Sequence, residues 1–209
     1  MGQYGFYFDS AKCTGCKTWQ VACKENYRLP AHNLFRRVYH YAGGSWEPTE
    51  AGFYAPVDTF SYQVSVSCNH CADPACVAAC PTGAMHKDPE TGIVTTDHEL
   101  CAGCQACVEA CPYQAPSLDE EAGYVIKCDF CREEIEAGNT PFCVAACPMR
   151  ALDWGEYDDL VARYGEGNVN VEPFPTATTN PCLVLNPHPK AQASGSGTGA
   201  MATLDEELF

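Results

Sequence analysis

The apolar positions of this chain fall in short runs that predict strands, and each run precedes a group of cysteines. The runs cover residues 5–8, 62–66, 92–95 and 124–126. Short stretches rich in Val, Ile, Tyr and Phe between turn residues are typical of strands. Residues 88–92, Asp-Pro-Glu-Thr-Gly, predict a turn. The pattern therefore predicts a repeated unit of strand, cysteine-rich loop, short helix and returning strand.

Three further segments do not follow this unit. Residues 24–60 are rich in large aromatic side chains, which predicts an insertion that packs against a partner or, alternatively, over the cysteine-rich loops. Arg36 and Arg37 lie in it, on either an interface strand or a solvated edge. Residues 158–164 predict a short helix. From residue 186 onward, Pro, Ser and Gly predict an extended tail that is mobile or lies across a neighbour.

The composition leaves little material for an ordinary core. Leu, Ile, Val and Phe make up fewer than one residue in five, and 27 acidic against 12 basic side chains give a net charge of −15. Such values are normally typical of disorder, because too little apolar surface offsets the chain entropy. The chain also contains 16 cysteines. We therefore expect the cysteines to hold the chain together.

The same features exclude several classes of protein. No apolar run approaches the roughly 20 residues of a membrane-spanning helix. The first residues show no secretory signal pattern, and a net charge of −15 does not favour nucleic acid, which requires clustered Lys and Arg. No nucleophile–base arrangement, phosphate-binding glycine loop or carboxylate pair is evident. We therefore expect no active site in this chain.

Fifteen of the cysteines form four runs, and Cys182 stands alone. The runs are Cys13, Cys16, Cys23; Cys68, Cys71, Cys76, Cys80; Cys101, Cys104, Cys107, Cys111; and Cys128, Cys131, Cys143, Cys147. The third run reads C-x2-C-x2-C-x3-C-P, the spacing of bacterial ferredoxins, in which the fourth cysteine binds the other run's cluster. The second and fourth runs keep the C-x3-C-P ending. Disulfides, zinc and free core thiols explain these endings less well than iron–sulfur clusters.

The runs and the blocks between them resemble one known family. The blocks are residues 3–6, 13–18, 35–39, 41–44, 68–71, 73–76, 83–87, 110–113, 127–129 and 150–153. They resemble the iron–sulfur electron-transfer (beta) subunits of anaerobic dimethyl sulfoxide reductases, within the molybdopterin oxidoreductase family. The resemblance implies an electron relay between a molybdopterin catalytic subunit and a quinol-oxidising membrane anchor. The partner's substrate stays open: a sulfoxide, an N-oxide, a sulfur oxyanion or an aromatic hydroxyl compound.

The resemblance also implies an α+β fold of two pseudo-symmetric, bacterial-ferredoxin-like modules, each binding two clusters, with insertions and an extended C-terminal tail. Residues 1–23 and 124–152 would form one module and residues 61–123 the other. Residues 24–60 would be the aromatic interface insertion. Residues 153–209 would be a C-terminal extension ending in a flexible tail.

Four ligand sets follow from the resemblance, and we name them sites A to D. Site A comprises Cys13, Cys16 and Cys147. Site B comprises Cys23, Cys128, Cys131 and Cys143. Site C comprises Cys68, Cys71, Cys76 and Cys111, and site D comprises Cys80, Cys101, Cys104 and Cys107. Sites B, C and D are expected to hold 4Fe–4S clusters.

Site A departs from the family pattern, because Trp19 stands where the third cysteine is expected. An indole has no lone pair to offer iron and acts only as a hydrogen-bond donor. The site would then hold a 3Fe–4S cluster, a 4Fe–4S cluster with a substitute ligand such as Cys182, or no cluster. Cys182 has a simpler interpretation as a small buried hydrophobic residue.

Two further expectations concern tuning and location. Trp19, His70, Lys127 and Cys182 are candidates for tuning the clusters; His70, Lys127 and also Lys87 flank ligand cysteines and are either hydrogen-bond donors that raise a potential or solvated charges. The complex is expected at the cytoplasmic membrane, on its outer face after co-export with the catalytic subunit, or alternatively in the cytoplasm.

An iron–sulfur enzyme with an open iron is the competing hypothesis for function.

Overall fold

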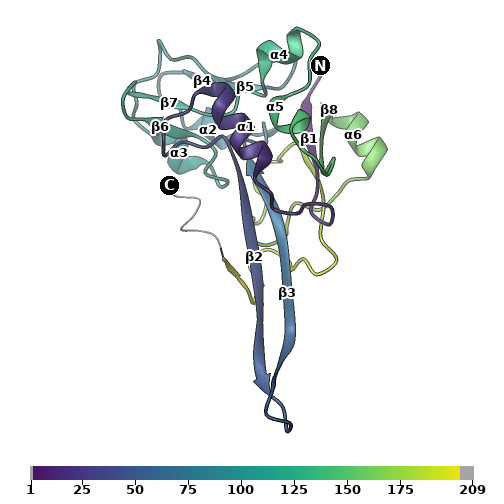
Figure 1. The fold of residues 1–209 in the computed structure, drawn as a ribbon. Coiled ribbons are helices and arrows are strands. Elements are labelled where there is room, and N and C mark those ends of the chain that lie inside the picture. The colour runs from purple at the N-terminus through teal and green to yellow at the C-terminus, as the bar shows by residue number, and fades with distance from the viewer. Residues whose placement is uncertain (1, 203–209) are drawn as a thin grey trace.

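One long hairpin projects from a body of short strands and helices. The computed structural model describes residues 2–202. The hairpin consists of β2 (Arg36–Pro48) and β3 (Tyr54–Ser67), and Figure 1 shows it extending away from the other elements. The two strands pair antiparallel along nearly their whole length, with a bulge between Gly43 and Ser45. The body carries all four cysteine runs.

The first strand of the body is completed by segments from the far end of the sequence. β1 (Tyr4–Asp9) is the middle strand of a three-stranded sheet and confirms the strand predicted over residues 5–8. β8 (Leu152–Glu156) pairs with it antiparallel, and β9 (Leu183–Asn186) pairs with it parallel. Because both partners come late in the sequence, this sheet joins the N-terminal run to the C-terminal third of the protein.

The predicted helix over residues 158–164 is confirmed as α6 (Tyr157–Tyr164), which follows β8 directly. Its Leu160 is fully buried and packs with Tyr7 of β1 and Val184 of β9. The helix therefore covers one face of the three-stranded sheet.

Two small hairpins carry the middle runs. β4 (Met85–Lys87) pairs with β5 (Val94–Thr96), and β6 (Ser117–Asp119) pairs with β7 (Tyr124–Ile126). Since β7 joins a sheet with β6, the strand at 124–126 lies with the segment 61–123 rather than with the module predicted to begin at residue 124. A hairpin partner four residues upstream is nearer in sequence than the N-terminal strand, which is paired with β8 and β9.

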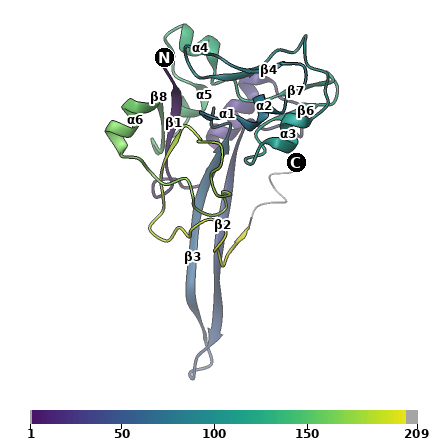
Figure 2. The same ribbon diagram turned by 180° about the vertical axis from the view of Figure 1, so that it is seen from behind.

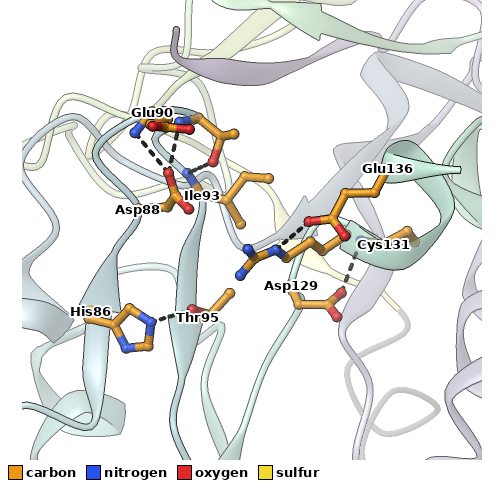
Figure 3. A network of polar contacts seen from close by, with 10 residues as sticks. His86, Asp88, Glu90, Ile93, Thr95, Asp129, Cys131 and Glu136 are labelled. Atoms are coloured by element: carbon orange, nitrogen blue, oxygen red, sulfur yellow. Dashed lines mark hydrogen bonds and ion pairs between the residues drawn. The ribbon is translucent and has the colours of Figure 1, made fainter. Parts of the chain in front are cut away.

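The predicted turn at residues 88–92 is present between β4 and β5. The Asp88 carboxylate accepts the backbone N–H groups of Glu90 at 2.8 Å and Thr91 at 3.0 Å (Figure 3). This side-chain cap is the reason that an Asp opens the turn.

The body's helices are short and follow the cysteine pairs. They are α1 (Thr18–Tyr27), α2 (Ala75–Ala78), α3 (Ala106–Ala110), α4 (Arg132–Glu136) and α5 (Phe142–Ala145). All except α4, which the sequence analysis did not anticipate, contain a ligand-candidate cysteine. Helices of four or five residues are not stable alone in water, so their stability depends on their surroundings.

The aromatic insertion predicted over residues 24–60 begins in α1, and from Arg36 onward it forms the projecting hairpin, whose aromatic residues divide into two kinds. Near the body, Tyr41 is buried with Tyr62 and Val64 of β3. At the far end Trp46, Phe53 and Tyr54 are 65%, 74% and 69% exposed. Local packing thus accounts for the base of the hairpin, and the tip is uncovered. Arg36 is only 3% exposed, so the expectation of a solvated edge is wrong for it.

The C-terminal segment lies on the protein's own hairpin. β10 (Ala200–Met201) pairs antiparallel with Tyr41 and Ala42 of β2, and the Gly199 N–H donates to the Tyr41 hydroxyl at 3.1 Å. Figure 2 shows the segment between α6 and β10 passing beside the hairpin. Residues 199–202 of the predicted tail are therefore bound to β2, and His188 and Lys190 contact β3; the rest of the tail, 203–209, lies outside the described residues. Within 2–202, no helix is both long and apolar enough to cross a bilayer.

Candidate metal centres

All sixteen cysteines lie within the described residues, and all are free thiols. Disulfide bonds therefore do not compensate for the small number of aliphatic side chains. Instead, cysteines belong to each of the three larger buried clusters of the body. The body is built around its thiols.

The cysteines of sites C and D surround two separate cavities. One cavity is lined by all four cysteines of site C, together with Lys127 and Thr179. The other is lined by all four cysteines of site D, together with Met85 and Val125. In each case the run that supplies three cysteines receives its fourth, Cys111 or Cys80, from the neighbouring run. This exchange is the arrangement that the ferredoxin spacing predicts.

The cysteines of sites A and B are also brought together from distant parts of the sequence. Burial raises the pKa of Cys13 to about 11, and the nearby thiols of Cys147 and Cys16 raise it further. Burial likewise raises the pKa of Cys23, with Cys143 and Cys131 adding to the effect. Cys23 and Cys143 meet because their helices, α1 and α5, pack against each other.

The chemistry of the buried thiols fits a metal cluster. Burial raises the pKa of Cys71 and Cys76 to about 12 and that of Cys131 to about 11. At neutral pH such thiols stay protonated, and only a bound cation converts them to thiolate ligands. Among residues 2–202, no three ligating side chains converge closely enough for a single metal ion. A four-iron cluster is larger than one ion, so the four-cysteine cavities are the relevant test of fit.

Backbone amides point at several of these sulfurs. Cys80 Sγ accepts the N–H of Met85 at 3.3 Å, and Cys147 Sγ accepts that of Ala151 at 3.2 Å. Similar contacts reach Cys101 from Val125 N–H at 3.4 Å and Cys128 from Phe130 N–H at 3.4 Å. Hydrogen bonds to the sulfurs are one of the ways in which a protein sets a cluster's potential.

Comparison with known proteins identifies the family. The sequence is 48% identical over 200 residues to the B chain of the anaerobic dimethyl sulfoxide reductase of Haemophilus influenzae, a match that covers 95% of this protein and 96% of that one. It is 45% identical over 205 residues to the subunit of the same name in Escherichia coli, with 98% of each covered. This protein belongs to the B-chain family of anaerobic dimethyl sulfoxide reductases.

A second comparison concerns the cysteine-rich part of this B-chain family member. A 4Fe-4S dicluster domain family matches residues 59–157, the stretch that contains the last three runs. Protein NrfC of Escherichia coli is 35% identical over 159 residues, covering 75% of this protein and 67% of that one. The protein therefore binds 4Fe–4S clusters in a ferredoxin-like domain and is an iron–sulfur electron-transfer subunit.

In this subunit, Trp19 fills the space beside site A. The indole is 2% exposed and belongs to the same buried cluster as Cys143 and Cys147. Its edge meets the Phe8 ring at a centroid distance of 6.0 Å. Its Nε1–H is buried and has no hydrogen-bond partner among the described residues. The ring is thus packed as core, with one polar atom left over next to the site.

Cys182 lies elsewhere. It is buried next to site C, where burial raises its pKa to about 11 and Lys87 and Cys68 act on it as well. Its N–H donates to the Asn69 carbonyl at 3.1 Å. The structure therefore does not bring Cys182 to site A as a substitute ligand, and its position agrees with the interpretation as a small buried hydrophobic residue.

The charged neighbours of the cysteines differ from one another. His70 is completely buried and Lys127 is 5% exposed, so the solvated-charge interpretation is wrong for both. Lys87 is half-buried and donates to the Cys71 and Ala72 carbonyls at 2.9 and 3.0 Å.

Sequence reasoning missed two hydroxyl groups and one cation at these sites. Thr18 Oγ1 donates to Cys16 Sγ at 3.2 Å and, as the main cause, lowers its pKa, whereas Thr179 Oγ1 donates to Cys71 Sγ at 3.2 Å. Thr18 lies two residues after Cys16, so its position in the sequence could have indicated this hydrogen bond. Thr179 lies more than a hundred residues from Cys71, and nothing in the sequence near either residue indicates the contact. The cation is Arg36, which we consider below.

Proposed function

We propose that this subunit relays electrons through four clusters, one at each of sites A to D, to or from a molybdopterin catalytic subunit of the dimethyl sulfoxide reductase type. The observation that carries the proposal is the grouping of fifteen cysteines from four runs into sets that exchange their fourth members. The protein supplies thiolates, shields most of them from water and directs amide and hydroxyl donors at several of their sulfurs. The clusters, when bound, supply one-electron chemistry.

Iron and acid-labile sulfide analysis of the purified complex, with a redox titration followed by EPR, tests this relay. We expect four separate one-electron couples and no turnover without the catalytic subunit. Zinc with negligible iron and sulfide would contradict the proposal. A spectral change on adding a substrate to this subunit alone would favour the open-iron enzyme instead. The substrate of the complex is a sulfoxide in this proposal, because the family relatives carry that name.

We propose further that site A holds a 3Fe–4S cluster bound by Cys13, Cys16 and Cys147. Trp19 supports this assignment, because its buried ring occupies the place of the third cysteine and offers no ligand atom. The described residues place no substitute cysteine there. A three-iron cluster needs only three thiolates, whereas a four-iron cluster would need a ligand from outside these residues.

EPR of the oxidised complex tests the site A assignment. We expect the signal of an oxidised 3Fe–4S cluster in the native protein and its loss in Trp19→Cys, with one more iron bound. Trp19→Phe is the matched control, since it keeps a large ring and adds no ligand, and it should retain the signal. A full four-iron count in the native protein without that signal would contradict the assignment.

The pairing of sites supports two pseudo-symmetric modules, each with two sites. Sites C and D exchange Cys80 and Cys111 across α2 and α3, and sites A and B exchange Cys23 and Cys147 across α1 and α5. We place the second module at residues 61–123 extended by β7, and the first at residues 1–23 with the rest of the segment up to 152. Serine variants test the pairing: Cys80→Ser should alter the cluster at site D, and Cys111→Ser the cluster at site C.

The tip of the hairpin is our proposed contact with the catalytic subunit. Trp46 and Tyr54 are its exposed aromatic residues, and aromatic residues are enriched at the centres of protein interfaces. We expect the double variant Trp46→Ala/Tyr54→Ala to co-purify less catalytic subunit than the native protein does. Leu100→Ala is the control, because Leu100 is 54% exposed on the body. Weaker co-purification in the control alone would place the interface on the body.

We place the complex at the outer face of the cytoplasmic membrane, joined to a quinol-oxidising anchor subunit. Clusters form under reducing conditions, so this location requires the folded subunit to be exported together with its catalytic partner. Protease treatment of intact spheroplasts tests it. Digestion of the subunit is expected at the outer face, and protection until lysis would indicate the cytoplasm.

A further inference from the structure

Two buried cations lie in the middle of the body without acidic partners. Arg36 is 3% exposed and Lys127 is 5% exposed. The sequence carries 27 acidic side chains. Even so, no ion pair joins either cation to a carboxylate within residues 2–202. A buried charge without a counter-charge is strongly destabilising, so each cation needs a negative charge from another source.

Arg36 opens β2 directly after Phe35, which belongs to the same buried cluster as Cys23 and Cys128 of site B. Its guanidinium carbon lies 4.4 Å from the centroid of the Phe6 ring, and its Nη1 donates to Ser65 Oγ at 3.0 Å. Its Nη2 is buried and has no hydrogen-bond partner among the described residues. The pKa of Cys23, which burial raises, is held down by Arg36. The guanidinium therefore acts electrostatically on a thiol of site B.

Lys127 lies between sites B and C. Its ammonium donates to the carbonyl oxygens of Val94 and Cys128, and its side chain lines the cavity of site C. Burial is the main cause of the raised pKa of Cys76, Cys111 and Cys128, and Lys127 opposes it at all three. One ammonium thus faces thiols of two neighbouring sites.

His70 shows that this region is positive. Its Nδ1 accepts the Val94 N–H at 3.0 Å, so the ring proton is on Nε2. Lys127, Arg36 and Lys87 all act on this ring electrostatically. By contrast, the charges that act most on Cys107 of site D are the other three thiols of that site.

We propose that Arg36 and Lys127 are the fixed counter-charges of the clusters at sites B and C and raise the reduction potentials of these two clusters. The inference rests on the proposed function, because it requires clusters at these sites. Reduction adds one electron, received from the neighbouring centre of the relay, with no bond made and no proton taken up. The added negative charge is stabilised by a cation that is already in place and shielded from water. Neither side chain binds iron, so both are positioning residues that act on the clusters through their charge.

The test is an EPR-monitored redox titration of the intact complex. We expect Arg36→Gln to lower the equilibrium constant for reduction of the site B cluster about tenfold, which is about 59 mV for one electron. Lys127→Met should lower those of sites B and C by a similar factor. The clusters at sites A and D should keep their potentials. Arg163→Gln, which removes an exposed cation paired with Asp153, should move none of the four.

A charge-retaining variant separates electrostatics from packing. Arg36→Lys loses the guanidinium geometry but keeps the charge, so it should keep the native potential. Equal shifts in Arg36→Lys and Arg36→Gln would overturn the proposal, as would unchanged potentials in both Arg36→Gln and Lys127→Met. If Arg36→Gln fails to hold the site B cluster, retention of iron by Arg36→Lys supports the counter-charge, and iron loss from both variants overturns it. Iron and sulfide content of the native complex tests the proposed function separately.

Discussion

The projecting hairpin and the cysteine-bearing body are held together in different ways. β2 and β3 pair over more than ten residues each and bury Val38, Tyr62 and Val64 at their base. The body has sheets of two or three short strands and helices of mostly four or five residues, which form few backbone hydrogen bonds of their own. The hairpin therefore relies on ordinary pairing and apolar packing, whereas the body depends on what its cysteines bind.

Removal of iron should give the largest difference between the two regions. Without clusters, the buried thiols of the body lose the ions that join distant runs, and metal-binding energy is folding energy in small metalloproteins. We expect amides of β4 to β7 to exchange hydrogen at nearly the unprotected rate, while the paired base of β2 and β3 keeps part of its protection. Hydrogen exchange followed by mass spectrometry measures both. Full protection of β4 to β7 without iron would contradict the comparison.

A matched pair of valines should give the next largest effect. Val94 is completely buried beside the site C and D cysteines, and Val64 is 1% exposed at the base of the hairpin. Each change to Ala costs about 2 kcal/mol of packing. We expect Val94→Ala to speed iron loss to a chelator up to about 30-fold, because its cost falls on the sites. The bleaching rate should change little in Val64→Ala, and equal rates in both variants would contradict the distinction.

An effect confined to the hairpin is expected at the bulge in β2. Gly44 has φ +106°, and a Cβ there would lie 2.5 Å from the Thr59 Cα. We expect Gly44→Ala to destabilise the hairpin by about 3 kcal/mol through backbone strain and this contact, as measured by hydrogen exchange in β3. Gly52 at the tip is the control, since its φ is also positive but no atom lies within 4 Å of an added Cβ. Its change to Ala should cost about 1 kcal/mol.

The smallest effect concerns the segment bound to β2. Tyr41→Phe removes the hydroxyl that accepts the Gly199 N–H and should weaken the attachment of β10 by about 1 kcal/mol. Limited proteolysis after residue 186 should become faster, with no change in iron content. An unchanged digestion rate would show that strand pairing alone holds the segment.

The apolar runs and turn residues predicted several local elements of the body correctly. The strand over residues 124–126 has the predicted bounds, the turn at 88–92 is present, and the helix predicted at 158–164 begins one residue earlier. These features depend on nearby residues, such as Asp88 and the amides that it caps. The spacing indicated that paired runs exchange their last cysteine, and the assignment of cysteines to sites A to D came from the family resemblance and stays a prediction.

Long-range features were less accessible from the sequence. Nothing near β1 indicates that β9 will pair with it, and the Gly-rich segment before β10 carries no pattern that points to β2. In the sequence Arg36 looks like a surface residue, because two adjacent arginines suggest an exposed strand edge. Its burial depends on contacts with Phe6 and Ser65, which lie on other strands. The aromatic insertion was recognised, but one stretch of rings could not indicate that its base is covered and its tip is not.

The placement of β1 has a consequence for biosynthesis. This strand leaves the ribosome long before its two sheet partners, which end at residues 156 and 186. At 5–20 residues per second, the nascent polypeptide carries Phe6 and Phe8 without their sheet for roughly ten to forty seconds. A chaperone that binds the segment around β1 would shield these two rings during that interval, and β1 cannot complete its sheet until residue 186 has been synthesised.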